Sequence, residues 1–228
     1  MSTSLNRSAP TDSEPFESGP VESGPVESDP TGARVRRMPR RVGVLVIATV
    51  VVVTTAVAWF ASRDQVVPYT DPQSTGLLTL CDESGKPVTE GRVDDTPFAP
   101  IVVGATPLDG RIPGDLVANA TLYGYQPREA IEPLEFSGSP IGGPVPFVDH
   151  ERPATRVVPD AWSIANFVEV FPADLDGYVQ LRLITSVSGF GANTTSYDTA
   201  DIKVDGESWH VVRGGHADCT GAAALLGD

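Results

Sequence analysis

The strongest hydrophobic pattern in the chain is an uncharged apolar run over residues 42–61, VGVLVIATVVVVTTAVAWFA. At about 1.5 Å per residue, a helix of this length spans roughly 30 Å, which is the hydrocarbon thickness of a bilayer. Valine fills eight of the twenty positions and forms helices poorly in water. In lipid, however, a helix is the one single-segment structure that pairs all its backbone groups internally. The pattern therefore predicts one transmembrane helix over residues 42–61.

The charges that flank this run predict its orientation. After the run, only Arg63 follows, beside Asp64. Because positive flanks stay in the cytoplasm, we expect a plasma-membrane protein with a cytoplasmic N-terminus and residues 62–228 outside. The N-terminal flank carries five arginines, Arg34, Arg36, Arg37, Arg40 and Arg41.

A cleaved secretion signal is the alternative. Ala56-Val57-Ala58 has the small-x-small form of a peptidase site, and Arg40-Arg41 faintly resembles a twin-arginine signal. The 41 residues before the run and the length of the run favour a retained anchor. Both interpretations place the C-terminal part outside the membrane.

Two segments without regular hydrophobic periodicity flank the anchor. Residues 1–41 begin with a near-repeat rich in Ser, Pro, Glu and Gly, which predicts a disordered cytoplasmic tail. Residues 62–75 contain Pro68 and Pro72 and predict an extended linker. The folded outer domain is expected over residues 76–228.

Short alternating segments in the outer domain predict β-strands. They cover residues 76–81, 97–103, 116–125 and 178–187, and a hairpin of 200–204 with 208–213 around Asp205-Gly206-Glu207. In the segment 178–187, Val179, Leu181, Leu183 and Thr185 are expected to face the core, and Tyr178, Gln180 and Arg182 to face out.

The remaining segments complete the expected fold. Residues 160–171 have helical periodicity, with Asp160 as the expected N-cap and Pro172 as the end signal. The Pro- and Gly-rich residues 126–159 predict irregular loops with one or two edge strands. We therefore expect a mainly β fold, an antiparallel β-sandwich that is loosely immunoglobulin-like, with one short helix.

Charge limits the partners of the outer part. The chain has a net charge of −14, and residues 62–228 hold ten Lys and Arg against twenty-four Asp and Glu. Such a surface repels nucleic acid and anionic lipid. A nucleic-acid partner is therefore not expected.

The only cysteines, Cys81 and Cys219, both lie in the outer part. In an oxidising compartment they are expected to form a disulfide that joins the start of the domain to its end. Two free buried thiols are the alternative.

Three segments, LYGYQPREAIEPLEFSG, DGYVQLRLIT and TADIKVDGESWHVVRGG, resemble parts of uncharacterised single-pass membrane proteins of high-GC bacteria. The fourteen Arg against two Lys fit such a genome. The resemblance implies a similar tail, anchor and outer β domain, and it implies no activity.

Candidate chemistry is sparse. The chain has no G-x-S-x-G pentapeptide, and the sequence around Cys81 and Cys219 does not match a cysteine transpeptidase. Asp149-His150-Glu151 and His216-Ala217-Asp218 lack the spacing of a zinc site. No catalytic, cofactor-binding or metal-binding residue is therefore predicted.

These observations favour a non-enzymatic, membrane-anchored module of the cell envelope. It contacts membrane lipid through its anchor and binds an envelope protein or a cell-wall component. The loops 126–160 and 189–199 are the expected docking segments. The alternatives are an envelope enzyme whose site forms no linear motif and, more weakly, a signal relay through the N-terminal tail.

Overall fold

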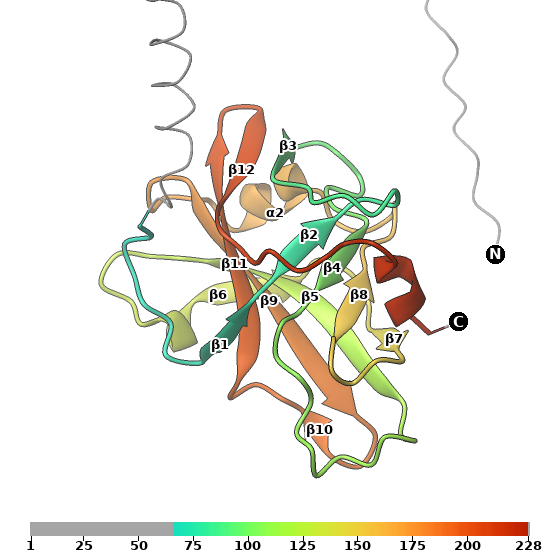
Figure 1. Ribbon diagram of the computed structural model, residues 1–228. Helices are drawn as coiled ribbons and strands as arrows, with labels where there is room; N and C mark the ends of the chain where they lie inside the picture. Colours follow the sequence, from blue (N-terminus) through green and yellow to red (C-terminus); the bar gives the residue numbers. More distant parts are fainter. Residues whose placement is uncertain (1–65, 228) are drawn as a thin grey trace, which may run out of the picture. The chain divides into compact units, whose positions relative to one another are not determined.

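The computed structural model describes residues 66–227 (Figure 1). The expected tail, the expected membrane helix over residues 42–61 and the five arginines before it lie outside these residues. No helix within residues 66–227 has the length and apolarity that crossing a bilayer requires.

Residues 66–227 form two β-sheets (Figure 1). The larger sheet has the order β3 (Glu90–Arg92), β12 (Ser208–Arg213), β11 (Tyr197–Asp205), β9 (Tyr178–Val187), β5 (Ala118–Gln126) and β6 (Ser137–Pro140). Three short strands extend it: β1 (Ser74–Leu77) runs parallel to β11, while β10 (Gly191–Ala192) and β7 (Val145–Phe147) run antiparallel to β9 and β5. The smaller sheet has the order β2 (Thr79–Cys81), β4 (Ile101–Val103) and β8 (Ala154–Arg156). The helical segments are α2 (Ile164–Val170) and the 3-10 turns η1 (Pro133–Glu135) and η2 (Ala222–Leu225). The prediction of a mainly β fold with antiparallel pairing and one short helix is confirmed.

The two sheets share one hydrophobic core. Leu80 of β2 and Val102 of β4 belong to the same buried cluster as Leu122 of β5 and Leu181 of β9. The helix α2 closes this core at one end, because Phe167 is fully buried in the same cluster. Its ring lies directly over a glycine of β5.

That glycine, Gly124, is needed for the close approach. A Cβ atom at this position would lie 2.7 Å from a ring carbon of Phe167, which is closer than van der Waals contact allows. The absence of a side chain at Gly124 therefore lets the helix sit against the sheet.

The central strands follow the predicted periodicity on one face only. The inner positions Val179, Leu181 and Leu183 of β9 are buried as expected. The expectation that Tyr178, Gln180 and Arg182 face solvent was wrong, because all three are buried. Residues 66–77 and the turn η1 cover this second face, so both faces of strand β9 are covered by other segments (Figure 1).

The segment before the first expected strand is part of the fold. Val67 and Asp71 are buried, and Ser74 already pairs with Tyr197 of β11. The part of the expected linker from Val67 onward therefore packs on the domain.

The single strand expected over residues 76–81 is two strands in different sheets. Leu78 separates them, and its backbone N–H donates to the carbonyl of Thr199 in the larger sheet. Leu80 then pairs with Val102 in the smaller sheet. Residues 78–81 are all buried, so the run is apolar because it passes through the core between the sheets.

The predicted helix exists, but it begins later than expected. Ser163 is the N-cap: its hydroxyl accepts from the backbone N–H of Asn166, whose side chain accepts from the N–H of Ser163 in return. The N-cap expected at Asp160 was wrong because this reciprocal pair lies three residues further on. The helix ends at Val170, shortly before Pro172 as predicted.

The region 126–159 is more regular than expected. It holds η1, β6, β7 and all of β8, and the strand β8 is a buried member of the smaller sheet. The hairpin of β11 and β12 is confirmed, with Asp205 opposite Ser208 and Gly206 in the turn.

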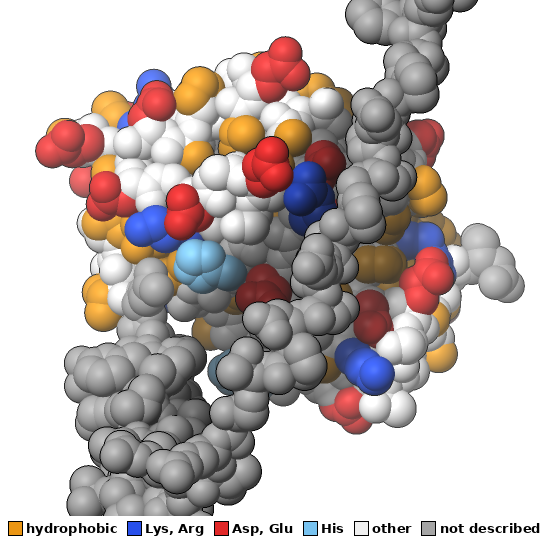
Figure 2. Space-filling model, turned by 90° about the horizontal axis from the view of Figure 1, so that it is seen from above, with side chains coloured by type: hydrophobic (Ala, Val, Ile, Leu, Met, Phe, Trp, Pro, Cys, Tyr) orange, Lys and Arg blue, Asp and Glu red, His pale blue; other side chains and the backbone are white. Residues whose placement is uncertain are grey.

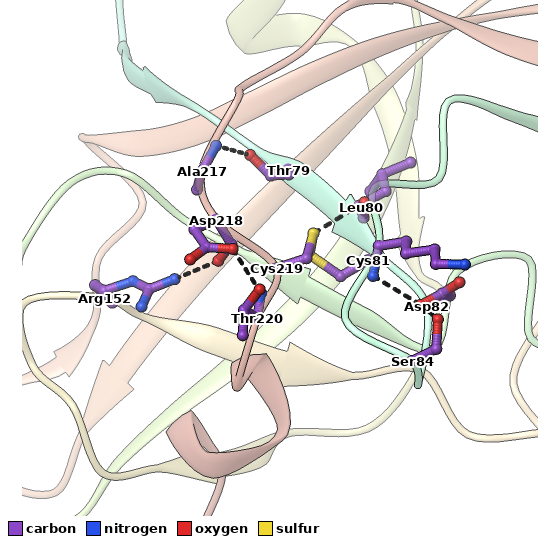
Figure 3. The surroundings of a disulfide bond; sticks show 11 residues. Thr79, Leu80, Cys81, Asp82, Ser84, Arg152, Ala217, Asp218, Cys219 and Thr220 are labelled. Atoms are coloured by element: carbon purple, nitrogen blue, oxygen red, sulfur yellow. Dashed lines mark hydrogen bonds between the residues drawn. A yellow bond between two sulfur atoms is a disulfide. The ribbon is translucent and has the colours of Figure 1, made fainter.

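The disulfide between Cys81 and Cys219 is confirmed (Figure 3). It links strand β2 to the C-terminal segment, and both residues are buried beside Ile101 and Leu225. The backbone N–H of Ala217 also donates to the hydroxyl of Thr79 at 2.9 Å, as Figure 3 shows. The C-terminal segment is thereby fixed over the outer face of the smaller sheet.

Candidate functional site

Two features of residues 66–227 hold polar side chains in a setting that could form a functional site. The first is the outer-face cluster, a set of buried and partly buried polar side chains between the larger sheet and residues 66–77. Its members are Tyr69, Asp71, Gln180, Arg182, Tyr197, Asp201 and Arg213.

Arg182 lies at the centre of this cluster. Its guanidinium donates to the Gln180 side chain at 2.6 Å and to the Pro133 carbonyl at 2.7 Å, and it lies 3.5 Å from an oxygen of Asp71. The guanidinium carbon also lies 4.0 Å from the centre of the Tyr125 ring, a cation–π distance. Only 4% of the Arg182 side chain is exposed. Arg182 therefore has no open side that a ligand could reach.

A second ion pair continues the cluster, with the Asp201 side chain fully buried and the Arg213 side chain 29% exposed. Arg213 donates to Asp201 at 2.6 Å, and the Tyr69 hydroxyl donates to the same carboxylate. Burial raises the pKa of Asp201, and the positive charge of Arg213 opposes that change. Burial and the neighbouring Asp201 carboxylate raise the pKa of the Tyr69 hydroxyl well above its usual range, so it stays protonated as the donor.

These contacts define the role of the outer-face cluster. Tyr69 and Asp71 come from the segment before β1, while their partners come from β9, β11 and β12. The cluster fixes residues 66–77 to the sheet. Because its carboxylates and Arg182 are buried and already paired, we assign it to the stability of the fold.

The second feature is an open cavity of about 680 Å³ beside β10, called the β10 groove here. It lies where the loop after β4, the tip of the β9–β11 connection and strand β1 come together, at the lower end of the domain in Figure 1. Its volume falls within the range of small-molecule sites in proteins. Its lining residues are Thr75, Thr106–Asp109, Arg111, Ile112, Pro153, Leu183, Thr185–Val187, Phe190–Asn193 and Thr195–Asp198.

Asp198 forms the inner wall of the β10 groove and is 4% exposed. Its carboxylate accepts from the backbone N–H groups of Ala105 and Thr106 at 2.6 and 2.8 Å, and from the Thr106 hydroxyl at 2.5 Å. Three donors therefore hold this carboxylate, and it ties the loop after β4 to the sheet. Gly76 of β1 lies so close that a Cβ atom there would come within 2.4 Å of the carboxylate.

Asp109 and Arg111 supply the other charges of the lining. Arg111 donates through Nη2 to Asp109 at 2.5 Å, and its side chain is 88% exposed. The hydrogen bond from Arg111 lowers the pKa of Asp109 to about 2, so the pair stays ionised at neutral pH. Each charge is matched by the other at the rim.

The rest of the lining combines neutral polar groups with apolar surface. Thr185, Ser186 and Thr195 supply hydroxyls, and Asn193 supplies an amide. The apolar surface comes from the floor, Leu183 and Val187, and from the Phe190 ring, which is 57% exposed at the groove. An arrangement of this kind recognises a neutral ligand by hydrogen bonds and by contact with an exposed ring.

Of the two predicted docking segments, one lines much of the groove and the other contributes little to it. Residues 190–193 and 195–198 of the expected loop 189–199 line it, whereas the expected loop 126–160 contributes only Pro153. Residues 104–115, which supply Thr106 to Ile112, were missed. The available signal was the long connection between two strand patterns, with Pro107, Gly110 and Pro113 in it.

The histidine clusters weighed in the sequence are not assembled into metal sites. Within residues 66–227, no group of three or more His, Cys, Asp or Glu side chains is arranged to hold an ion. His150 lies with its ring 6.0 Å from that of Phe147.

Acidic side chains are spread over the surface. On the face seen in Figure 2, Asp and Glu side chains lie at many separate places and the basic side chains lie among them. This distribution agrees with the twenty-four acids and ten basic residues of positions 62–228.

Comparison of the chain with protein-family models, with curated proteins and with solved structures finds no match.

Proposed function

We propose that the chain is a membrane-anchored binding module of the cell envelope, non-enzymatic, whose outer domain takes its ligand in the β10 groove. The anchor is the apolar helix over residues 42–61, and the five arginines before it keep the N-terminus in the cytoplasm. The ligand is an envelope protein or a cell-wall component.

The observation that carries this proposal is the β10 groove itself. It is a cavity of about 680 Å³ whose walls come from four separate parts of the chain, with an exposed aromatic ring and several hydroxyl groups in its lining. Large, mixed apolar and polar cavities built from loops on a rigid sheet are the usual form of binding sites.

The outer location is supported by the cysteine chemistry. The Cys81–Cys219 bond closes a separation of 138 residues, and structural disulfides of this kind form in oxidising compartments. The strongly acidic composition of residues 62–228 fits a domain that stays clear of anionic headgroups.

We also propose that the two sheets form a sandwich. Two sheets that share one core, with Leu80 and Val102 on one side and Leu122 and Leu181 on the other, support a β-sandwich that is loosely immunoglobulin-like. Loops at the end of such a sandwich are its common binding surface.

Site-specific photocrosslinking tests the proposal. A photoreactive benzoylphenylalanine at position 190, in the full-length chain in intact cells, should give a discrete crosslinked species because this ring lies at the mouth of the groove. The matched control is the same group at position 134, since Leu134 is 56% exposed and lies outside the groove lining.

A species that forms from position 190 and is absent from position 134 supports a groove-dependent ligand. Identical patterns from the two positions, or no crosslink from either, contradict the proposal.

A further inference from the structure

We propose that the ligand of the β10 groove is an uncharged saccharide, so that the module binds a neutral glycan of the envelope. This inference rests on the proposed binding role of the groove and specifies the class of ligand. It is carried by the charges, the hydroxyl groups and the aromatic ring of the lining.

The charge balance argues against an ionic ligand. Asp198 already accepts three hydrogen bonds from Ala105 and Thr106. Asp109 and Arg111 neutralise each other at 2.5 Å. No other Asp, Glu, Lys, Arg or His lines the cavity in the described part of the chain. A charged ligand would lose its hydration there without gaining an ionic partner.

The neutral polar groups match a polyhydroxylated ligand. The Asn193 side-chain oxygen accepts from both the N–H and the hydroxyl of Thr195, so the two amide hydrogens of Asn193 remain as donors. Hydroxyls such as those of Thr185 and Ser186 both donate and accept, which is what neighbouring sugar hydroxyls require.

The Phe190 ring supplies the apolar part of recognition. It is 57% exposed and lines the same cavity as the apolar side chains of Val187 and Leu183. Sugar rings carry apolar C–H faces as well as hydroxyl edges. An exposed aromatic face next to hydroxyl side chains therefore fits both parts of one sugar ring.

An extended peptide fits the groove less well. Peptides usually add to a free strand edge through a run of backbone hydrogen bonds. The strand β10 at the edge of the groove is two residues long, and Gly189 and Gly191 beside and within it have left-handed φ values of 84° and 82°. Such a twisted, two-residue edge offers a poor template for a peptide.

The test is a binding titration of the full-length chain in a detergent without a sugar headgroup. The probes are tetramers of N-acetylglucosamine, glucose, mannose, galactose and arabinose, with tetragalacturonate as the anionic probe and a capped neutral tetrapeptide as the peptide probe. At least one neutral tetramer should bind, and the anionic probe and the peptide should bind about tenfold more weakly or not at all.

Variants locate the binding. Phe190→Ala should weaken binding of the neutral tetramer by about tenfold or more, because the stacking surface is lost. Phe190→Trp should retain it, and Leu134→Ala, at an equally exposed position elsewhere, should leave it unchanged. Since position 190 is exposed, these variants are expected to fold normally.

Three results would overturn the inference: no binding by any neutral tetramer, binding that Phe190→Ala leaves unchanged, or tighter binding of the peptide or of tetragalacturonate. If position 190 still crosslinks a partner in cells while no saccharide binds, the ligand class is wrong and the binding role stands. If neither crosslinking nor saccharide binding occurs, the binding role itself fails.

Discussion

Replacing Arg182 with methionine should lower the free energy of unfolding by about 3–5 kcal/mol, the usual cost of removing one partner of a buried ion pair. The variant keeps a long side chain but leaves the Asp71 carboxylate, whose side chain is 0% exposed, without its cation. It also removes the hydrogen bonds to Gln180 and to the Pro133 carbonyl. Urea unfolding of the purified full-length chain, followed by tryptophan fluorescence, measures the change.

An exposed ion pair provides the control. Arg92 pairs with Asp94, and the two side chains are 58% and 62% exposed. Arg92→Met should therefore leave the unfolding midpoint almost unchanged. Adding Asp71→Asn to Arg182→Met should cost less than the sum of the two single changes, because the buried charge is removed together with its partner. Additive losses, or a loss from Arg182→Met no larger than that from Arg92→Met, would contradict the assigned role of the outer-face cluster.

The double substitution Cys81→Ser, Cys219→Ser should lower the free energy of unfolding by about 5 kcal/mol in the chain-entropy model. The bond joins residues 138 positions apart and attaches the C-terminal segment to β2. Its loss therefore increases the conformational entropy of nearly the whole domain in the unfolded state. Urea midpoints of the two proteins, each with and without dithiothreitol, give the effect.

Reductant serves as the internal control for this experiment. It should shift the midpoint of the parent protein toward that of the variant and should not affect the variant, which has no cysteine left. Equal midpoints of the oxidised parent and the variant would show that the bond contributes little to stability.

The parts of the fold that the sequence predicted are those with a regular, local signal. The alternation of 116–125, the strand 178–187 and the hairpin around Gly206 were each apparent from neighbouring residues alone. The disulfide was predictable because the chain contains only two cysteines.

The predictions that were wrong share a different physical cause, because each of these features depends on a contact with a segment distant in sequence. Arg182 and Gln180 look like solvent-facing positions until residues 66–77 are known to cover them with Asp71 and Tyr69. The division at Leu78 depends on two different partners, Thr199 in one sheet and Val102 in the other. Local periodicity carries no information about such contacts.

The candidate site was predictable only in part for the same reason. The loop 189–199 stood out as a long, irregular and partly apolar segment, and it lines the β10 groove. The opposite wall, Thr106 to Ile112, reaches the groove because Asp198 binds the backbone of Ala105 and Thr106 across more than ninety residues of sequence.

Labelling of cysteines in intact cells tests the central claim, an outer domain held by a membrane anchor. In the full-length chain, Cys81 and Cys219 are bonded to each other, so a newly introduced cysteine is the only reactive thiol. Glu207→Cys lies at a side chain that is 85% exposed on the outer domain, and Ser4→Cys lies in the expected cytoplasmic tail. A membrane-impermeant maleimide should label position 207 in intact cells and position 4 only after the cells are lysed. Labelling of position 4 in intact cells, or protection of position 207 until lysis, would contradict the account.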